Sequence, residues 1–197
     1  MVSTRRRLSP DERRRILLEA GAKLFAERAY DTVLMDDVAA AAGVSRALLY
    51  RHFPTKRDLF AGVYQLAADR LLVATTLDTE TPLREQLSAG LDAHLDYFEA
   101  NSTTVVTANK VLAGDPTIQA IITGELGELH HRLLELIGVE GATRETTSAI
   151  LMSWLTFVRV LSIEWLENRA FSRIELREVC IGALLGALEP VLGDRDK

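Results

Sequence analysis

This chain has little cysteine, and its sequence does not begin with a leader-type segment. Its 197 residues include a single cysteine, Cys180, so an intrachain disulfide cannot form. The sequence does not open on a charged, apolar and small-residue leader. Together these absences lead us to expect an unmodified protein in a reducing cytoplasm, with Cys180 as a small core residue.

A long uninterrupted apolar run is also missing. The stretch closest to one, residues 149–163, is broken by Ser153, Thr156 and Arg159 and is shorter than the roughly 20 residues that a membrane-spanning helix needs. We therefore expect no association with a membrane. The hydrophobic share of 48% is still high enough to exclude a disordered chain and to supply one or two packed domains.

Familiar catalytic motifs are absent as well. The chain has no GxSxG, P-loop, GxGxxG or HExxH motif. One Glu-x-x-His pair, Glu128 with His131, resembles half of the ligand set of a di-iron bundle, which needs two such pairs and two further glutamates. With four histidines and no second pair, we predict no enzyme, no cofactor and no metal site. A helical metal-dependent enzyme is the main rival interpretation.

Acidic charge is in excess, but the excess is confined to one part of the chain. The net charge is −5. Residues 1–57 contain 12 Lys and Arg against 7 Asp and Glu, or +5, whereas residues 58–197 contain 11 against 21, or −10. A basic first part on an acidic body is typical of a protein that contacts a polyanion at one end. Within the basic part, residues 5–7 are three arginines that form either a groove-reaching arm or a solubilising tail.

Helical periodicity runs through nearly the whole sequence, which predicts an all-α protein of about nine helices. Ser9 to Glu12 reads as the capping box of a first helix, and Gly43 ends a second helix at 35–42. Ser45 caps a third helix that ends near Phe53, before a long fourth helix. Further helices are expected at about 82–101, 103–113, 116–138, 143–169 and 172–192, after a linker at 78–82. We place a first domain at 1–57 and a second, larger helical domain at 58–197.

The two short helices on either side of Gly43 predict a helix-turn-helix. Its second helix would project as a rod of about the width of the DNA major groove, roughly 12 Å. Six apolar residues sit where the helices must pack together: Val38, Ala39, Ala42, Val44, Leu49 and Phe53. This leaves a set free to face outward: Arg46, Ala47, Leu48, Tyr50, Arg51 and His52.

The segment GVSRALLYRHFPTKRDLF at 43–60, with MDDVAAAA before it, resembles the DNA-binding domain of the TetR family of bacterial transcriptional regulators. The resemblance covers roughly residues 10–60. It implies that Tyr50, His52 and Lys56 hold phosphates, Lys56 acting with the start of the fourth helix. It also implies that Arg46, Ala47, Leu48 and Arg51 face base edges, after the cap Ser45. An arginine can read guanine, and a small or apolar side chain can meet a thymine methyl.

Two departures from the family pattern stand out. Val33 and Leu34 occupy the positions before the second helix where the family has Thr or Ser, so the usual side-chain cap is missing. The recognition helix carries Ala47 and Leu48 where Gly and Thr are common. The operator sequence therefore cannot be taken from a relative.

The last two helices are apolar on several sides, which predicts partners on several sides. In TetR-like proteins these helices pair with their mates in a four-helix bundle, so the resemblance implies a homodimer. Gly182 and Gly186 stand four residues apart and permit close helix approach. The alternative is that this close face packs within the protomer. The predicted dimer residues are Trp154, Phe157, Leu161, Gly182, Leu185 and Gly186.

By resemblance, the helices at 82–138 enclose a cavity for an unknown small-molecule effector. Polar groups on apolar helices are the candidates to line it: His94, Tyr97, Asn109, His130, Trp154 and Arg159. Each of them is alternatively a core or interface residue with its bonds satisfied. Arg159, set among apolar neighbours, needs an anion, either Glu125, Glu128, Glu164 or an acidic ligand.

The predicted function is that of a TetR-type regulator, in the usual sense a repressor. It would bind palindromic double-stranded operator DNA as a homodimer, in a bacterial cytoplasm at the nucleoid, and a small molecule would release it. The second rival, beside the enzyme, is a helical adaptor that uses the same head to bind only protein.

Overall fold

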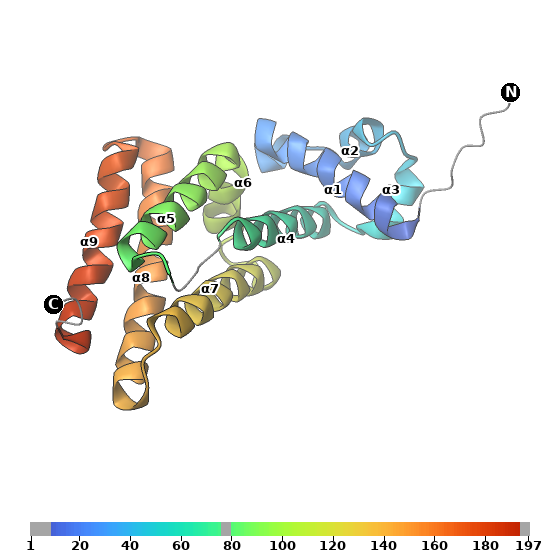
Figure 1. The fold of residues 1–197 in the computed structure, drawn as a ribbon. Helices are drawn as coiled ribbons and strands as arrows, with labels where there is room; N and C mark the ends of the chain where they lie inside the picture. Colours follow the sequence, from blue (N-terminus) through green and yellow to red (C-terminus); the bar gives the residue numbers. More distant parts are fainter. Residues whose placement is uncertain (1–8, 76–79, 194–197) are drawn as a thin grey trace, which may run out of the picture.

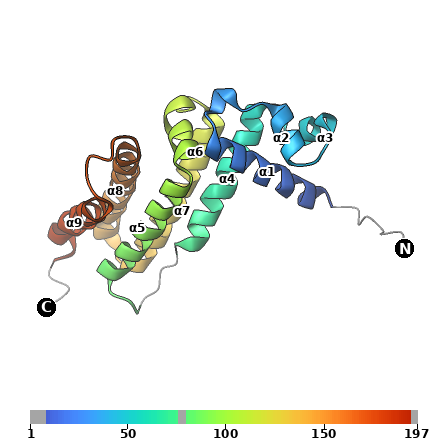
Figure 2. The same cartoon turned by 90° about the horizontal axis from the view of Figure 1, so that it is seen from above.

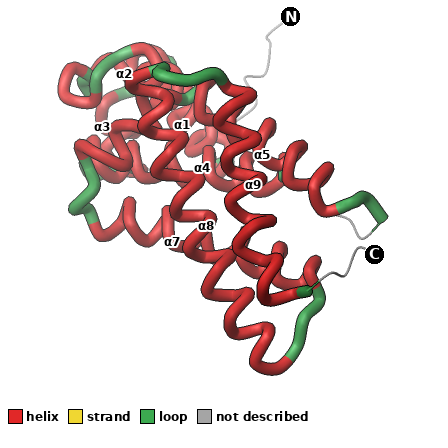
Figure 3. The backbone as a smooth tube through the Cα atoms, turned by 90° about the vertical axis from the view of Figure 1, so that its left-hand side faces the viewer, coloured by secondary structure: helices red, strands yellow, loops and turns green. Residues whose placement is uncertain are grey.

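The structure, a computed structural model, describes residues 9–75 and 80–193. Within those residues every regular element is helical, as predicted, and Figure 3 shows the helices joined by short loops. The first elements are α1 (Pro10–Glu27), the 3-10 turn η1 (Tyr30–Thr32), α2 (Met35–Ala41), α3 (Arg46–His52) and α4 (Lys56–Ala74). The others are α5 (Leu83–Ala100), α6 (Ser102–Val106), the π-helical turn η2 (Thr107–Val111), α7 (Pro116–Ile137), α8 (Gly141–Asn168) and α9 (Arg173–Leu192).

The helices form a head and a body that meet along α4. In Figure 1 the head, α1 to α3, lies at one end, and α8 and α9 stand side by side at the other. The view from above keeps the same separation (Figure 2). α4 contacts α1 in the head and α5 and α7 in the body. The domain boundary expected after residue 57 therefore falls inside the first turn of α4, and the linker expected at 78–82 lies partly outside the described residues.

Local capping explains where several helices begin. Ser9 and Glu12 form the predicted capping box of α1, with distances of 3.1 Å and 2.6 Å. Thr55 with Asp58 and Ser172 with Glu175 do the same for α4 and α9. α2 begins after Leu34 with no side-chain cap, as expected from its departure from the family pattern.

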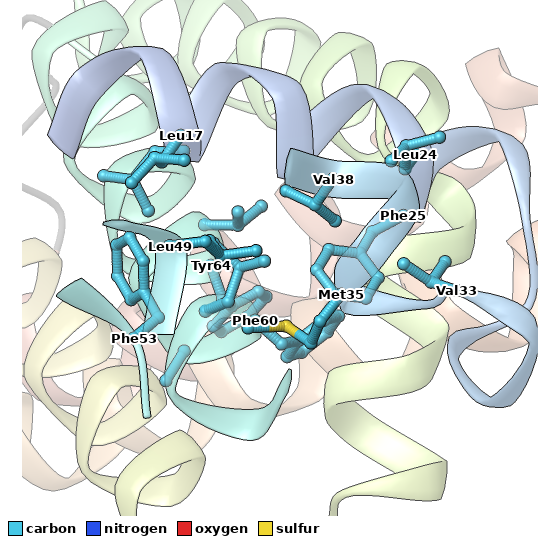
Figure 4. Packing of buried hydrophobic residues seen from close by; sticks show 14 of the residues in the cluster. Leu17, Leu24, Phe25, Val33, Met35, Val38, Leu49, Phe53, Phe60 and Tyr64 are labelled. Atoms are coloured by element: carbon cyan, nitrogen blue, oxygen red, sulfur yellow. The ribbon is translucent and has the colours of Figure 1, made fainter. Parts of the chain in front are cut away.

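The head core is an aromatic and aliphatic cluster shared by α1, α2, α3 and α4 (Figure 4), and it continues to Ala108 of η2 and to Ile118 and Ile122 of α7. Phe25 meets the edge of Phe60 with ring centroids 5.1 Å apart, and Phe60 stacks on Tyr64 at 6.3 Å. The predicted core residues Val38, Ala39, Leu49 and Phe53 are buried, and Ala42 and Val44 pack against them half-buried. α4 is thus fixed to the head through its apolar side.

α8 is the central helix of the body. Its length and composition would allow it to cross a membrane, but 44% of its most apolar stretch is buried inside the protein. Leu151 and Val158 pack in a core shared with α5, α7 and α9. A single helix of this kind is commonly a core helix, and we interpret α8 as a packed helix with one uncovered side.

The segment expected as one helix at 103–113 differs from the prediction. It begins as α6 and continues as the π-helical turn η2, where the Leu112 amide donates to the Thr107 carbonyl at 2.9 Å, five residues back. Inside this turn the Asn109 amide group donates to the Val105 carbonyl at 2.8 Å, and its oxygen accepts a bond from Arg159. A contact with α8, which periodicity does not encode, accompanies the wider turn.

Candidate DNA-binding surface, ligand cavity and dimer face

The candidate DNA-binding surface is built on α3, whose inner side is held on the head core. Gly43 has φ +65°, a left-handed conformation that allows a tight turn after α2. The Ser45 hydroxyl caps α3 by accepting a hydrogen bond from the Leu48 amide at 3.3 Å. Leu49 is fully buried and anchors the helix in the head core.

The opposite side of α3 faces solvent. Arg46, Ala47 and Arg51 are exposed, and 40% of the Tyr50 surface is accessible. Leu48 and His52 are half-buried. Two guanidinium groups, a phenol and small apolar side chains on a projecting helix are groups that meet bases and phosphates in the major groove. The residues at 5–7, the other candidate for a DNA contact, lie outside the described residues.

Arg46 is held by a carboxylate from α2. Its Nε lies 2.8 Å from Oδ1 of Asp36, and both side chains are more than half exposed. Such an exposed pair adds little stability. It positions the guanidinium beside α2, and a base contact would require Arg46 to leave Asp36.

The Lys56 ammonium, predicted to hold a phosphate, is hydrogen-bonded within the protein in this structure. It donates to the carbonyls of Tyr30, Asp31 and Val33, at 2.8, 3.2 and 3.2 Å, and lies 4.6 Å from the centroid of the Tyr30 ring. Three acceptors match the three protons of an ammonium. The side chain therefore ties α4 to the turn between α1 and α2, and a phosphate contact by its ammonium stays a prediction.

Replacing Lys56 by methionine is expected to destabilise the head by about 1–3 kcal/mol, because charge-assisted bonds to three carbonyls are lost. Urea unfolding followed by circular dichroism measures the change. Lys23→Met, at an exposed position on α1, is the matched control and should leave stability nearly unchanged. Equal stability of the two variants would contradict a structural role for Lys56.

An ion pair between the start of α4 and the start of α7 was not predicted from the sequence. Arg57, at the start of α4, lies 3.1 Å from Oδ2 of the buried Asp115. The other oxygen of Asp115 accepts the amides of Thr117 and Ile118 at 2.9 and 3.1 Å and so caps α7. The sequence Gly114-Asp115-Pro116, with a helix stop, a cap residue and a first-turn proline in succession, is typical of such a helix start, but nothing in the sequence pairs Asp115 with Arg57.

A cavity of about 60 Å³ lies in the body between α4, α5, α7 and α8. Its wall is mostly leucine, with Val158 and the indole of Trp154. The polar residues in the wall are Thr75, Gln86 and His94. This is the composition of a site for an apolar small molecule.

The structure places two of the predicted ligand residues, Trp154 and His94, in this wall, and His94 is the titratable one. Burial, and secondarily the nearby Arg159 cation, lowers the pKa of its imidazole to about 3, so the ring is neutral at physiological pH. The ring packs on Phe98 with centroids 3.9 Å apart. Its Nε2 atom is buried and has no hydrogen-bond partner within the described residues.

Arg159 lies beside the cavity in a buried polar cluster rather than in its wall. Its Nη1 is 3.3 Å from Oε1 of Glu125, its Nε donates to Asn109 at 3.0 Å, and its Nη2 donates to the Tyr64 hydroxyl. Of the anions considered from the sequence, Glu125 is therefore the partner. Burial raises the pKa of the Glu125 carboxyl, opposed by the Arg159 charge. Tyr64, on α4, was not predicted to belong to this cluster, because its sequence position identifies it only as a core residue.

The other predicted ligand residues are dispersed. The Tyr97 hydroxyl is buried without a partner, and burial raises its pKa. His130 has its Nε2 at 2.9 Å from the Ser148 hydroxyl and 3.1 Å from the Ser148 carbonyl, in the contact between α7 and α8. Neither residue lines the cavity, and their binding roles stay predictions.

An uncovered apolar face runs along α8 and α9. Phe157 and Val160 are 40% and 62% exposed on α8. Gly182 and Gly186 face solvent on α9, and nothing lies within 4 Å of the position that a Cβ would take at either glycine. A shallow groove between the helices is lined by Thr146, Ala149, Ile150, Ser153, Trp154, Phe157, Ala183 and Ala187. The close face predicted around the glycines is thus not packed within the described protomer.

The remaining predicted dimer residues belong to the protomer's own core. Trp154 is 8% exposed and its indole donates to the Cys180 carbonyl at 2.7 Å. Leu161 and Leu185 are half-buried against the same cluster. Cys180 is buried, as predicted, and burial raises the pKa of its thiol to about 11.

Potential metal ligands are scattered over residues 9–75 and 80–193. No three His, Cys, Asp or Glu side chains come together there in a way that could hold an ion. Glu128 of the Glu-x-x-His pair instead lies 2.8 Å from Nε of Arg132.

Residues 17–63, which contain the helix-turn-helix, match the family described as bacterial regulatory proteins, tetR family. The transcriptional activator FasR of Mycolicibacterium smegmatis is 41% identical over 98 residues. Residues 17–63 thus carry a TetR-type DNA-binding domain. The match to FasR covers 49% of this chain and 45% of FasR, so the chain spans less than half of that relative. The nucleoid occlusion factor SlmA of Shewanella amazonensis is 25% identical over 154 residues, 74% of this chain and 78% of SlmA.

Comparison with solved structures shows that the similarity of fold extends over nearly the whole of this chain. A TetR-family transcriptional regulator from Streptomyces coelicolor superposes with a TM-score of 0.81 at 24% identity, over 93% of this chain and 83% of that one. The fatty acid degradation regulator FadR of Bacillus halodurans gives 0.69 at 18% identity, over 93% and 98%. The body therefore shares the TetR fold although its sequence has diverged.

These matches favour one of the broad interpretations of the sequence. The family that matches residues 17–63 and the relative FasR are regulators of transcription, and the solved TetR-family structures share the fold of this chain.

Proposed function

We propose that this TetR-family regulator is a cytoplasmic repressor that binds a palindromic operator as a homodimer and leaves it when a small molecule fills the body cavity. The observation that carries the proposal is the outward face of α3, which is basic and solvent-exposed while its opposite side is fixed by the buried Leu49. Operator control is the use that best accounts for such a face on a TetR head.

Within the proposed interface, side chains divide by chemistry. Arg46 and Arg51 are assigned to base edges, where a guanidinium bonds guanine O6 and N7. Ala47 and Leu48 are assigned to thymine methyls. Tyr50 and His52 are assigned to phosphates, which position the head without reading sequence.

Lys56 is assigned to the interface only through its backbone. The ammonium already has three carbonyl acceptors. At the start of α4 the Thr55 hydroxyl caps the Asp58 amide, whereas the amides of Lys56 and Arg57 have no acceptor within the helix and lie at its positive dipole end. A phosphate near Lys56 would therefore meet the start of α4 rather than the lysine side chain.

Dimerisation is assigned to the uncovered face of α8 and α9. Exposed apolar residues such as Phe157 and Val160, next to glycines open to close approach, form a surface that another copy can cover. Two heads held in this way would read half-sites about one helical turn apart, roughly 34–36 Å.

Effector release is assigned to a shift of α4. Leu71 and Thr75, near the end of α4, line the cavity, while Phe60 near its start is packed in the head core. A molecule that separates α4 from α5 would change the angle of the head. A thousandfold loss of operator affinity requires only about 4 kcal/mol of difference between ligand affinities for the two states.

Selection of duplexes from random DNA tests the proposal. We expect a palindromic sequence to be enriched. We also expect the logarithm of the binding constant for this sequence to fall linearly with the logarithm of the salt concentration. Binding without any enriched sequence would favour the protein-only adaptor instead. A reporter behind the selected operator then gives the sign of regulation, which matters because FasR is named an activator.

Replacing Arg51 by alanine should flatten the base preference at one position in each half-site and weaken binding to the best operator by about 1–3 kcal/mol. Tyr50→Phe is the matched control, since it removes a hydroxyl assigned to a phosphate. We expect it to weaken binding to all sequences alike. Repeating the selection with both variants measures the difference, and an unchanged base preference in Arg51→Ala would refute the assignment.

A further inference from the structure

The chemistry of the cavity wall limits what can enter it. Leucines, Val158 and Trp154 make up most of the surface, and among the described wall residues there is no lysine, arginine, aspartate or glutamate. An ionised ligand group would lose its hydration here and gain no partner of opposite charge. The wall therefore favours an uncharged molecule.

Arg159, whose positive charge acts on His94, does not provide a partner for an anionic ligand. All of its nitrogens have acceptors, in Asn109, Glu125 and the Tyr64 hydroxyl, and its charge is balanced by Glu125. A carboxylate that entered the cavity would have to displace Glu125 from a buried ion pair. Such a displacement is unfavourable unless Glu125 finds another partner, because it leaves a buried carboxylate unpaired.

One polar atom in the wall is left to be satisfied. Thr75 donates to the Leu71 carbonyl, Gln86 donates to the Thr81 carbonyl, and the Trp154 indole donates to Cys180. Nε2 of His94 is buried and has no partner in the described chain. A buried nitrogen without a partner costs free energy that a ligand hydrogen bond would recover.

We propose that the cavity takes an uncharged, largely apolar small molecule whose single hydroxyl or amide group bonds to Nε2 of His94. Because the imidazole is neutral, Nε2 donates in one tautomer and accepts in the other, and a hydroxyl suits either. The effect of this ligand on operator binding rests on the proposed function, whereas binding of the ligand in the cavity does not require DNA.

The size of the cavity sets the first probe. A volume of about 60 Å³ has room for roughly four to six groups the size of water, at about 10–15 Å³ each. 1-Butanol has a matching number of heavy atoms. Butyrate and butylammonium have the same chain with a negative or a positive charge, so the three compounds separate charge from shape.

Titration of the full chain with each compound, followed by ligand-observed NMR and by tryptophan fluorescence, tests the proposal. We expect saturable binding of 1-butanol and at least about tenfold weaker binding of both ions. His94→Phe keeps the ring and removes Nε2, and it should weaken 1-butanol binding by about fivefold to tenfold.

A second variant fills the cavity without touching His94. A Cβ at Gly90, on α5, would lie 3.6 Å from the Thr75 methyl, so Gly90→Leu can be built and directs its side chain toward the cavity. It should abolish 1-butanol binding. Unchanged binding in Gly90→Leu, or ions that bind as tightly as the alcohol, would overturn the proposal.

Operator affinity, measured separately with and without 1-butanol, distinguishes the two proposals. If the alcohol binds the cavity but operator affinity is unchanged, the ligand class stands and release by cavity filling fails. If the operator is bound but no alcohol enters the cavity, the ligand class fails and operator control stands.

Discussion

Replacing Phe157 by aspartate is expected to convert the proposed dimer into monomers and to lower operator affinity by at least about 100-fold, or about 2.7 kcal/mol. Phe157 is 40% exposed in the protomer and borders the groove between α8 and α9. A charge there would be buried against apolar groups of a second copy, which is costly. Each monomer would then contact one half-site and lose the affinity that comes from two linked heads.

Analytical ultracentrifugation and operator binding measure this effect. Val73→Asp is the matched control, because Val73 is an apolar residue that is 79% exposed on α4, away from the α8–α9 face. We expect this control to remain dimeric and to bind DNA. A Phe157→Asp protein that remains a dimer would rule out this face as the interface.

Replacing Arg159 by methionine is expected to reduce the free energy of unfolding by about 3–5 kcal/mol. Arg159 and Glu125 have side chains that are 6% and 3% exposed, so the change leaves a carboxylate buried without its partner. Asn109 and Tyr64 also lose a donor. Denaturant unfolding of the full chain measures the loss.

Two further measurements separate the ion pair from general packing. Arg159→Met combined with Glu125→Leu should recover most of the loss, because an apolar replacement of a whole buried pair is often neutral. In the single variant the folded-state pKa of Glu125 should rise further above its unfolded-state value. The stability of this variant should therefore be greatest below the unfolded-state pKa of Glu125 and fall as the pH rises through the folded-state pKa. A loss that is independent of pH, with no recovery in the double variant, would contradict the pairing.

These two variants probe separate parts of one proposed transmission route. Tyr64 joins the Arg159 cluster to α4 and stacks on Phe60, which lies in the head core. Trp154 lines both the cavity and the groove between α8 and α9. A ligand that moves α4 or Trp154 would therefore act on the head and on the dimer face through packed side chains.

The sequence alone predicted those features that depend on neighbouring residues. Ser9 and Ser45 cap the helices that follow them, and Gly43 turns with positive φ, because caps and turns are satisfied within a few residues. The helix-turn-helix followed from the same local signals and from the spacing of its buried residues. Resemblance to the TetR family added the overall architecture.

Only the tertiary structure decided which groups meet across helices. Periodicity tells which side of a helix is buried, but not which helix lies against it. For that reason the sequence left three glutamates or an acidic ligand as partners for Arg159, and only the structure places Glu125 of α7 beside it. The three carbonyls that accept from the Lys56 ammonium could not be predicted from the sequence either. The cavity at His94 likewise arises from four helices far apart in the chain, whose relative placement no local signal encodes.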